Sequence, residues 1–304
     1  MYMKTMKTVL LSTLCSISLG LFAQTSAPKP AQRPIDAVIA KFNEGAAKVN
    51  SGDFKTAIAD FDEVIILAEK LGDEANDLKT KSQAQLPVLH YQVANALINQ
   101  KKYEEAIPEL EKAVELADLY NNNQVTKEKA LKFLPQLLTG VASQKYKEKN
   151  LAVAIENFDE AIKYDANYSK AYLGKGKVFS DQSKEKEMLE NLNKAIEIAK
   201  QAADTKTSEK AQSYISEFYV NQGNINLSEV DPEDIDYSPA IASFEKALES
   251  EKDANQIAAI NYELGNGYFG IAEYTLACES FNKALVGPTA EKAQSKKEKV
   301  LGCE

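Results

Sequence analysis

The stretch NYELGNGYFGIAEYTLACESFNKAL, from Asn261 to Leu285, shows how this chain is built. Small side chains recur in it at Gly265, Ala277 and Ala284, and bulky side chains stand between them. Residues at i, i+3, i+4 and i+7 share one face of a helix, and each half of the stretch has that spacing. The stretch therefore predicts two short helices joined by a turn, with small residues where the two backbones approach.

The apolar frame of the second half recurs along the chain. It runs small, aliphatic, large, small, aliphatic, with Phe281 as its large residue. Five earlier copies have their large residue at Phe61, Leu110, Phe158, Leu192 and Phe244. From Phe158 to Leu192 the residue number advances by 34. Six copies in the same order indicate a repeat protein, in which each helix pair buries its apolar face against its neighbours.

This period and frame resemble the tetratricopeptide repeat, a helix-turn-helix unit of about 34 residues. The resemblance covers residues 35–285 and implies an all-α fold, a right-handed α-solenoid of about six units with lengthened helices and a C-terminal capping helix. Aromatic residues open the second helix of four units, at Phe54, Tyr103, Tyr237 and Tyr274. The predicted repeats lie near residues 38–70, 87–118, 135–166, 169–200, 212–250 and 258–287, and the cap occupies residues 288–304.

Three steps of the repeat exceed this period. The residue number advances by 49 from Phe61 to Leu110, by 48 from Leu110 to Phe158, and by 52 from Leu192 to Phe244. The inserted sequence, such as that after Leu67, is rich in Ala, Glu, Lys and Leu, so we expect it to lengthen the flanking helices. In the fifth unit part of the insertion falls in the turn at residues 226–239, the longest irregular segment expected.

Residues 1–23 have the layout of a secretory signal peptide: Lys4 and Lys7, then an apolar run, then LFA before Gln24. Residues 24–34 contain three prolines, which are typical of an extended tether. Lipidation at Cys15 is disfavoured because Leu14 stands where a lipoprotein signal has a small residue. The sequence thus predicts an exported bacterial protein of the periplasm or cell envelope, with secretion as an alternative and no direct membrane insertion after cleavage.

The charge and cysteine content limit the classes of partner and the cross-links that we expect. The net charge of −9 argues against nucleic acid and anionic membranes, which reward clustered Lys and Arg. Beyond the leader, Cys278 and Cys303 can form one disulfide at most, and we consider both the bridged and the free state. No metal or other cofactor is predicted.

Catalysis has little support. The chain has one histidine, His90, which occupies a core slot of the second repeat and is interpreted as a packed residue. The segment LGKGKVF at residues 173–179 lacks phosphate-loop spacing, so its glycines are interpreted as helix-packing positions. The acids at residues 231–236 lack the register of a calcium loop and indicate a solvated acidic loop. We therefore expect a protein without enzyme activity.

The resemblance implies a peptide groove on the inner, concave face, which the first helix of each repeat lines. Asn side chains can pair with both N–H and C=O of an extended peptide, and Tyr adds amphipathic contact area. The slot that holds a carboxylate-clamping Lys in some relatives holds Phe42, Tyr91, Leu173 and Tyr262 here, so that clamp is not predicted. The candidate groove residues are Tyr91, Gln92, Asn95, Asn99, Ser143, Tyr146, Lys170, Lys177, Tyr262, Asn266 and Phe269.

Two functions remain open from the sequence. The first is a scaffold of the bacterial cell envelope that binds a protein or peptide partner along the concave face. The second is a self-associating structural or assembly component of an envelope complex. In either case the groove residues could also be no more than a hydrated helical surface.

Overall fold

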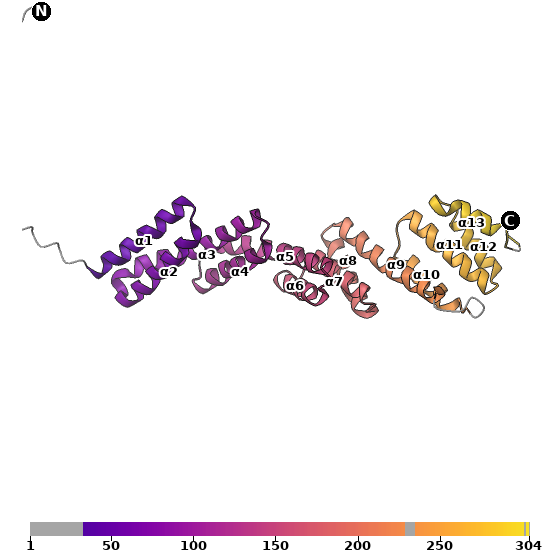
Figure 1. Ribbon diagram of the computed structural model, residues 1–304, viewed down its shortest axis with the longest axis horizontal. Helices are drawn as coiled ribbons and strands as arrows, with labels where there is room; N and C mark the ends of the chain where they lie inside the picture. Colours follow the sequence, from indigo (N-terminus) through magenta and orange to yellow (C-terminus); the bar gives the residue numbers. More distant parts are fainter. Residues whose placement is uncertain (1–32, 229–234, 301, 304) are drawn as a thin grey trace, which may run out of the picture.

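The computed structural model describes residues 33–228, 235–300 and 302–303. The predicted signal peptide, nearly all of the predicted tether and most of the acidic loop lie outside these ranges. Within them the chain is helical and contains no strand. The predicted fold class, an all-α solenoid with lengthened helices and a terminal cap, is confirmed. Figure 1 shows the helix pairs following one another along the long axis, with α1 near one end and α13 at the other.

Six helix pairs make up the stack. The first helices of the pairs are α1 (Pro34–Ser51), α3 (Asn76–Asn99), α5 (Gln124–Lys147), α7 (Ser169–Asp181), α9 (Thr205–Ser228) and α11 (Ala254–Gly270). The second helices are α2 (Phe54–Leu71), α4 (Tyr103–Leu119), α6 (Leu151–Tyr164), α8 (Glu185–Gln201), α10 (Ser238–Ser250) and α12 (Tyr274–Lys283). Two 3₁₀ turns, η1 (Gly72–Ala75) and η2 (Gly287–Thr289), precede α3 and the terminal helix α13 (Ala290–Lys297).

Each pair closes around one large side chain that faces a small residue. The large residues of the frame are essentially inaccessible to solvent in all six units. A Cβ placed on Gly265 would lie 2.6 Å from the ring of Phe281, so only glycine fits there without movement. Gly223 stands in the same relation to Phe244, and Gly176 to Leu192. These contacts fix the distance between the two helices of a pair.

The spacing of these small and large residues shows where the fifth unit differs. In the sixth unit the two residues stand at positions 265 and 281, whereas in the fifth they stand at positions 223 and 244. Five additional residues therefore lie in the turn between α9 and α10, where the sequence predicts a long irregular segment. Residues 229–234 of that turn lie outside the described ranges.

The other insertions lengthen helices, as expected. Helices α3, α5 and α9 each have 24 residues, whereas α7 has 13. The extra eleven residues all precede the small residue of the helix, because each of these helices ends five residues after it, as at Ala94 and Asn99. Eleven residues make about three full turns, so the added segment keeps the same face toward its neighbours.

The preceding second helix lengthens together with the first helix that follows it. Helices α2, α4 and α8 have 18, 17 and 17 residues, whereas α6 and α10, which precede shorter first helices, have 14 and 13. Ion pairs join two of these extensions, Lys79 of α3 to Glu69 of α2 at 2.9 Å, and Lys127 of α5 to Asp118 of α4. The extra residues thus extend two adjacent antiparallel helices and do not form loops.

Tyrosine hydroxyls join successive repeats to one another. Each of four tyrosines donates a hydrogen bond to a carboxylate in an adjacent repeat, at 2.5 to 3.1 Å. The pairs are Tyr146 with Asp181, Tyr164 with Glu111, Tyr219 with Glu185, and Tyr268 with Glu245. Every interface from the second repeat to the sixth therefore contains one such bond, which we call a tyrosine latch.

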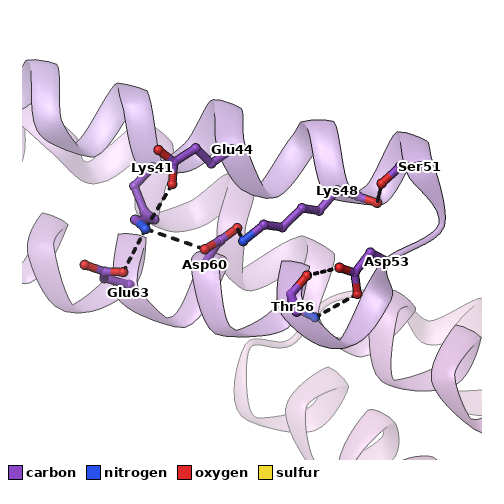
Figure 2. Close-up of polar contacts among 8 residues, drawn as sticks. All are labelled: Lys41, Glu44, Lys48, Ser51, Asp53, Thr56, Asp60 and Glu63. Atoms are coloured by element: carbon purple, nitrogen blue, oxygen red, sulfur yellow. Dashed lines mark hydrogen bonds and ion pairs between the residues drawn. The ribbon is translucent and has the colours of Figure 1, made fainter.

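The first repeat contains three charged residues at positions that are uncharged in the sixth repeat. Figure 2 shows Asp60 of α2 pointing at two lysines of α1, at 3.6 Å from Lys41 and 2.6 Å from Lys48. Lys41 also pairs with Glu44 and Glu63, and these contacts raise its pKa. Asp60 itself is buried. The two lysines occupy the slots that hold Asn261 and Tyr268 in the sixth repeat, and the buried acid compensates them.

The last helix covers the end of the stack. Ala293 of α13 is fully buried, and Val300 packs with Ala277 and Phe281 of α12. A disulfide joins Cys278 of α12 to Cys303, with the two Cα atoms 5.5 Å apart. The chain end is thereby fastened to the sixth repeat.

Candidate binding face on the first helices

The first helices form one side of the curved stack. Contacts join α1 to α3, α3 to α5, α5 to α7 and α7 to α9, while within the described ranges no comparable contact joins one second helix to the next. Helices that touch their counterparts lie on the inside of a curve, so this side is the concave face. The contact is weaker between α9 and α11, where the fifth and sixth repeats meet mainly through α10.

At the N-terminal end, α3 presents a stripe of amides. Gln92, Asn95 and Asn99 follow one another at helical spacing, the first two half-buried and the third exposed. Within the described part of the chain none of the three amides has a hydrogen-bond partner, so their donors and acceptors are open to a ligand. Next to the stripe in sequence, the half-buried Tyr91 packs its ring against Phe133, at 6.4 Å between centroids.

In the middle of the face the predicted residues are engaged with one another or with the backbone. Tyr146 of α5 donates to Asp181 of α7 at 2.5 Å, and Lys177 of α7 lies 3.2 Å from Asp181 and 3.6 Å from Glu217 of α9. The ammonium of Lys177 also stands 5.0 Å above the ring of Tyr214. A continuous chain of contacts therefore crosses α5, α7 and α9.

This network shifts the pKa of two of its members. Burial raises the pKa of Tyr146, and the hydrogen bond to Asp181 raises it further. Burial lowers the pKa of Lys177, but Asp181 and Glu217 outweigh it, so the net change is upward. The tyrosine stays neutral and the lysine charged at physiological pH, and both are held by intramolecular partners.

Two other predicted residues in this region lie outside the central network. The hydroxyl of Ser143 donates to the carbonyl of Thr139 at 2.8 Å, within α5. Lys170 is exposed at the start of α7, and its charge contributes to the lowered pKa of Asp204 after the hydrogen bonds from Thr207.

At the C-terminal end, α11 carries the last three predicted residues. Tyr262 packs against Phe281 at 6.0 Å between centroids. The amide nitrogen of Asn266 donates to Glu263 at 3.3 Å, while its buried oxygen has no partner among the described residues. Phe269 is 41% exposed and lies 5.8 Å from Tyr274.

The sequence does not identify three members of the central network, Asp181, Tyr214 and Glu217. Its pattern assigns no residue of α9 to the face, because the fifth repeat lacks the usual spacing between its small and large residues. Gly223 is the available signal, since it precedes Phe244 by five positions more than Gly265 precedes Phe281.

Within the described ranges no group of three or more His, Cys, Asp and Glu side chains could hold a metal ion. His90 is 15% exposed, and its Nδ1 lies 2.6 Å from Glu109 of α4. Gly174 packs on the ring of Phe158, so the glycines of residues 173–179 serve helix contact. No described helix is long and apolar enough to cross a membrane.

Comparison with known proteins bears on this helix-pair architecture. The family model of the tetratricopeptide repeat matches residues 87–120, which include the end of α3 and all of α4. The chain therefore contains a tetratricopeptide repeat, and its helix pairs have the tetratricopeptide-repeat fold. A curated relative, stress-induced-phosphoprotein 1 of Caenorhabditis elegans, is 28% identical over 155 residues, 46% of this chain and 48% of the relative. The chain therefore spans about half the length of that protein.

Two solved structures are similar to this chain over about 70% of its length. YrrB, described as a TPR protein with an unusual peptide-binding site, has a TM-score of 0.38 and 18% identity over 69% of this chain and 91% of its own. MamA has a TM-score of 0.36 and 17% identity over 71% of this chain and 95% of its own. The tetratricopeptide fold implies a scaffold for protein–protein interaction, and proteins of this class are generally non-enzymatic.

Proposed function

We propose that this protein is a non-enzymatic scaffold of the bacterial cell envelope that binds an extended partner segment along its concave face. The amide stripe of α3 carries the proposal. Its three side chains project from one helix face without intramolecular partners, and an extended backbone offers both the donors and the acceptors that amides pair with. The engaged centre of the face supplies a stiff platform between the two open ends.

The test compares amides on the concave face with amides elsewhere. The bait variant Asn95→Ala/Asn266→Ala removes two candidate contacts, and Asn193→Ala/Asn282→Ala removes two exposed amides from the second helices α8 and α12. Partners captured from envelope extract by the wild-type protein are then titrated by fluorescence anisotropy. We expect the first variant to bind about tenfold more weakly with the same melting temperature, and the second to bind as wild type. Equal binding by both variants would refute the groove.

Export rests on the layout of residues 1–23, which lie outside the described ranges. Expression of the full chain in a bacterial host, followed by N-terminal sequencing of the periplasmic fraction, checks it. The expected mature protein begins at Gln24. Retention of the full-length chain in the cytoplasm would contradict the proposed location.

One feature favours the self-associating alternative. Large apolar side chains are exposed around the turn between α11 and α12, at Phe269, Ile271, Tyr274 and Leu276, each 38 to 41% accessible. Exposed apolar groups of this kind mark interaction surfaces when they lie together. Sedimentation velocity over a hundredfold concentration range distinguishes the two: a constant monomeric coefficient excludes self-assembly as the function.

A further inference from the structure

A groove opens between α11 and α13 at the C-terminal end of the concave face. Its volume is about 420 Å³, and it is lined by Tyr262, Glu291, Lys292, Ser295, Lys296 and Lys299. All of these except Tyr262 are exposed. Within the described residues, Lys292, Lys296 and Lys299 take part in no ion pair.

The sequence of α13 repeats the beginning of α9. The segment EKAQS occurs at Glu209–Ser213 and again at Glu291–Ser295. The alanine of each copy, Ala211 and Ala293, is completely buried. Helix α13 therefore occupies the place that a seventh first helix would take. In this register Lys292, Lys296 and Lys299 correspond to Lys210, Tyr214 and Glu217 of α9.

At the corresponding positions of α9, the charged groups are paired within the protein. Tyr214 and Glu217 receive the ammonium of Lys177 from the preceding first helix, by ring contact and by ion pair. Lys177 follows the packed glycine Gly176, and its counterpart on α11 is Asn266, which follows Gly265. Between α7 and α9, positive and negative groups thus come from the protein itself.

Between α11 and α13 the same positions lack this balance. Three lysines replace a lysine, a tyrosine and a glutamate, and Asn266, the residue that corresponds to Lys177, is neutral. The acids in contact with these residues are Glu291, which lines the groove, and Glu263, which accepts from Asn266. Three cations therefore stand in one groove of a chain whose net charge is −9.

We propose that the groove between α11 and α13 binds an acidic peptide segment of the partner, whose carboxylates take the place that Glu217 fills between α7 and α9. Lys292, Lys296 and Lys299 receive the carboxylates, and the ring of Tyr262 packs against the peptide backbone. This inference rests on the proposed function and adds the chemistry of the partner at one end of the face.

The probe is a fluorescein-labelled octaglutamate peptide, titrated with the full mature chain at low salt, against an octaglutamine peptide of the same length. We expect octaglutamate to bind and octaglutamine not to bind. The variant Lys292→Gln/Lys296→Gln/Lys299→Gln should weaken octaglutamate binding about tenfold, and Lys→Arg at the same positions should retain it within about twofold. Raising the salt concentration should weaken binding by the wild-type protein.

The matched control is Lys70→Gln/Lys186→Gln/Lys283→Gln, which removes the same charge from exposed lysines of three second helices. Equal loss of binding in both triple variants would show a general charge effect and overturn the site, as would binding of octaglutamine with equal strength. Because the probe is synthetic, this result is independent of the Asn95 and Asn266 test with the natural partner. If the Asn95→Ala/Asn266→Ala variant loses the natural partner but octaglutamate binding does not depend on the three lysines, the scaffold function stands and the acidic site is refuted.

Discussion

The carboxylate of Asp60 lies 2.6 Å from the ammonium of Lys48, inside a helix pair whose counterpart in the sixth repeat has Ser280 and Tyr268 at these two positions. Lys41 approaches the same carboxylate from the other side, at 3.6 Å. One buried acid thus serves two lysines that replace core residues, and the first repeat depends on it.

Replacing Asp60 by Ala should lower the free energy of unfolding by about 2 kcal/mol, because Lys48 loses its counter-charge and Lys41 loses the buried one of its three carboxylate partners. The control is Glu63→Ala, which removes another carboxylate from Lys41 but an exposed one, and should cost less than about 0.5 kcal/mol. Urea denaturation followed by circular dichroism measures both. Equal effects of the two substitutions would contradict the assigned role.

Two glycines in first helices should respond oppositely to alanine. At Gly265 a Cβ would lie 2.6 Å from Phe281, whereas at Gly140 of α5 it would meet nothing within 4 Å. Gly265→Ala should destabilise by about 1–3 kcal/mol through overpacking, and Gly140→Ala should stabilise by about 0.5–1 kcal/mol through helix propensity. Thermal melting of the two variants checks the opposite signs, and a shared sign would refute the packing argument.

The tyrosine latches predict alkaline sensitivity. Burial together with the neighbouring carboxylate raises the pKa of Tyr164 and of Tyr268 to about 12, above the usual value of about 10. A raised folded-state pKa means that the contribution to stability is complete below about pH 10 and is lost as the pH rises to about 12. Melting temperature should therefore fall across that window, with tyrosinate absorbance rising at unfolding. Stability that is flat across the same window would contradict the latches.

A single latch can be tested at neutral pH. Tyr268→Phe removes the hydroxyl that donates to Glu245 at 2.5 Å and should cost about 1 kcal/mol. The control is Tyr103→Phe at the first residue of α4, whose hydroxyl has no hydrogen bond to a carboxylate within the described chain. The control should change stability by less than about 0.3 kcal/mol.

The bridge between Cys278 and Cys303 gives a redox prediction. It closes a segment of 25 residues, and a loop of that length contributes about 3.5 kcal/mol by the chain-entropy relation. Dithiothreitol should lower the melting temperature of the wild-type protein, and Cys303→Ser should lower it equally without further response to the reductant. Thiol titration under denaturing conditions reports the bridge directly, and free thiols at both Cys278 and Cys303 in protein purified without reductant would refute it.

Much of the architecture follows from local pattern. The residues predicted to open the second helices do so in the first, second and sixth repeats, at Phe54, Tyr103 and Tyr274. In the fifth, Tyr237 caps α10 from the position before it. These helix starts depend on residue spacing within one helix pair, and that spacing can be read directly from the sequence.

The latches and the central network depend instead on how repeats are stacked. The partners of the latches are 35, 53, 34 and 23 residues apart, with no common spacing, because each crosses a turn or an insertion of different length. The frame within one repeat therefore predicts that Tyr146 and Lys177 face a ligand, although they lie against Asp181. Pairing between helices of different repeats is fixed by tertiary packing and has no signature in one unit.

The eleven-residue extensions of α3, α5 and α9 change the length of a helix without changing the direction of its side chains. A whole number of turns adds reach at one edge of the stack while every downstream side chain keeps its direction. Insertion of seven residues would also preserve direction, whereas nine would turn the two parts of the helix by about half a revolution relative to one another. The width of the stack and the set of side chains on its concave face can thus change independently.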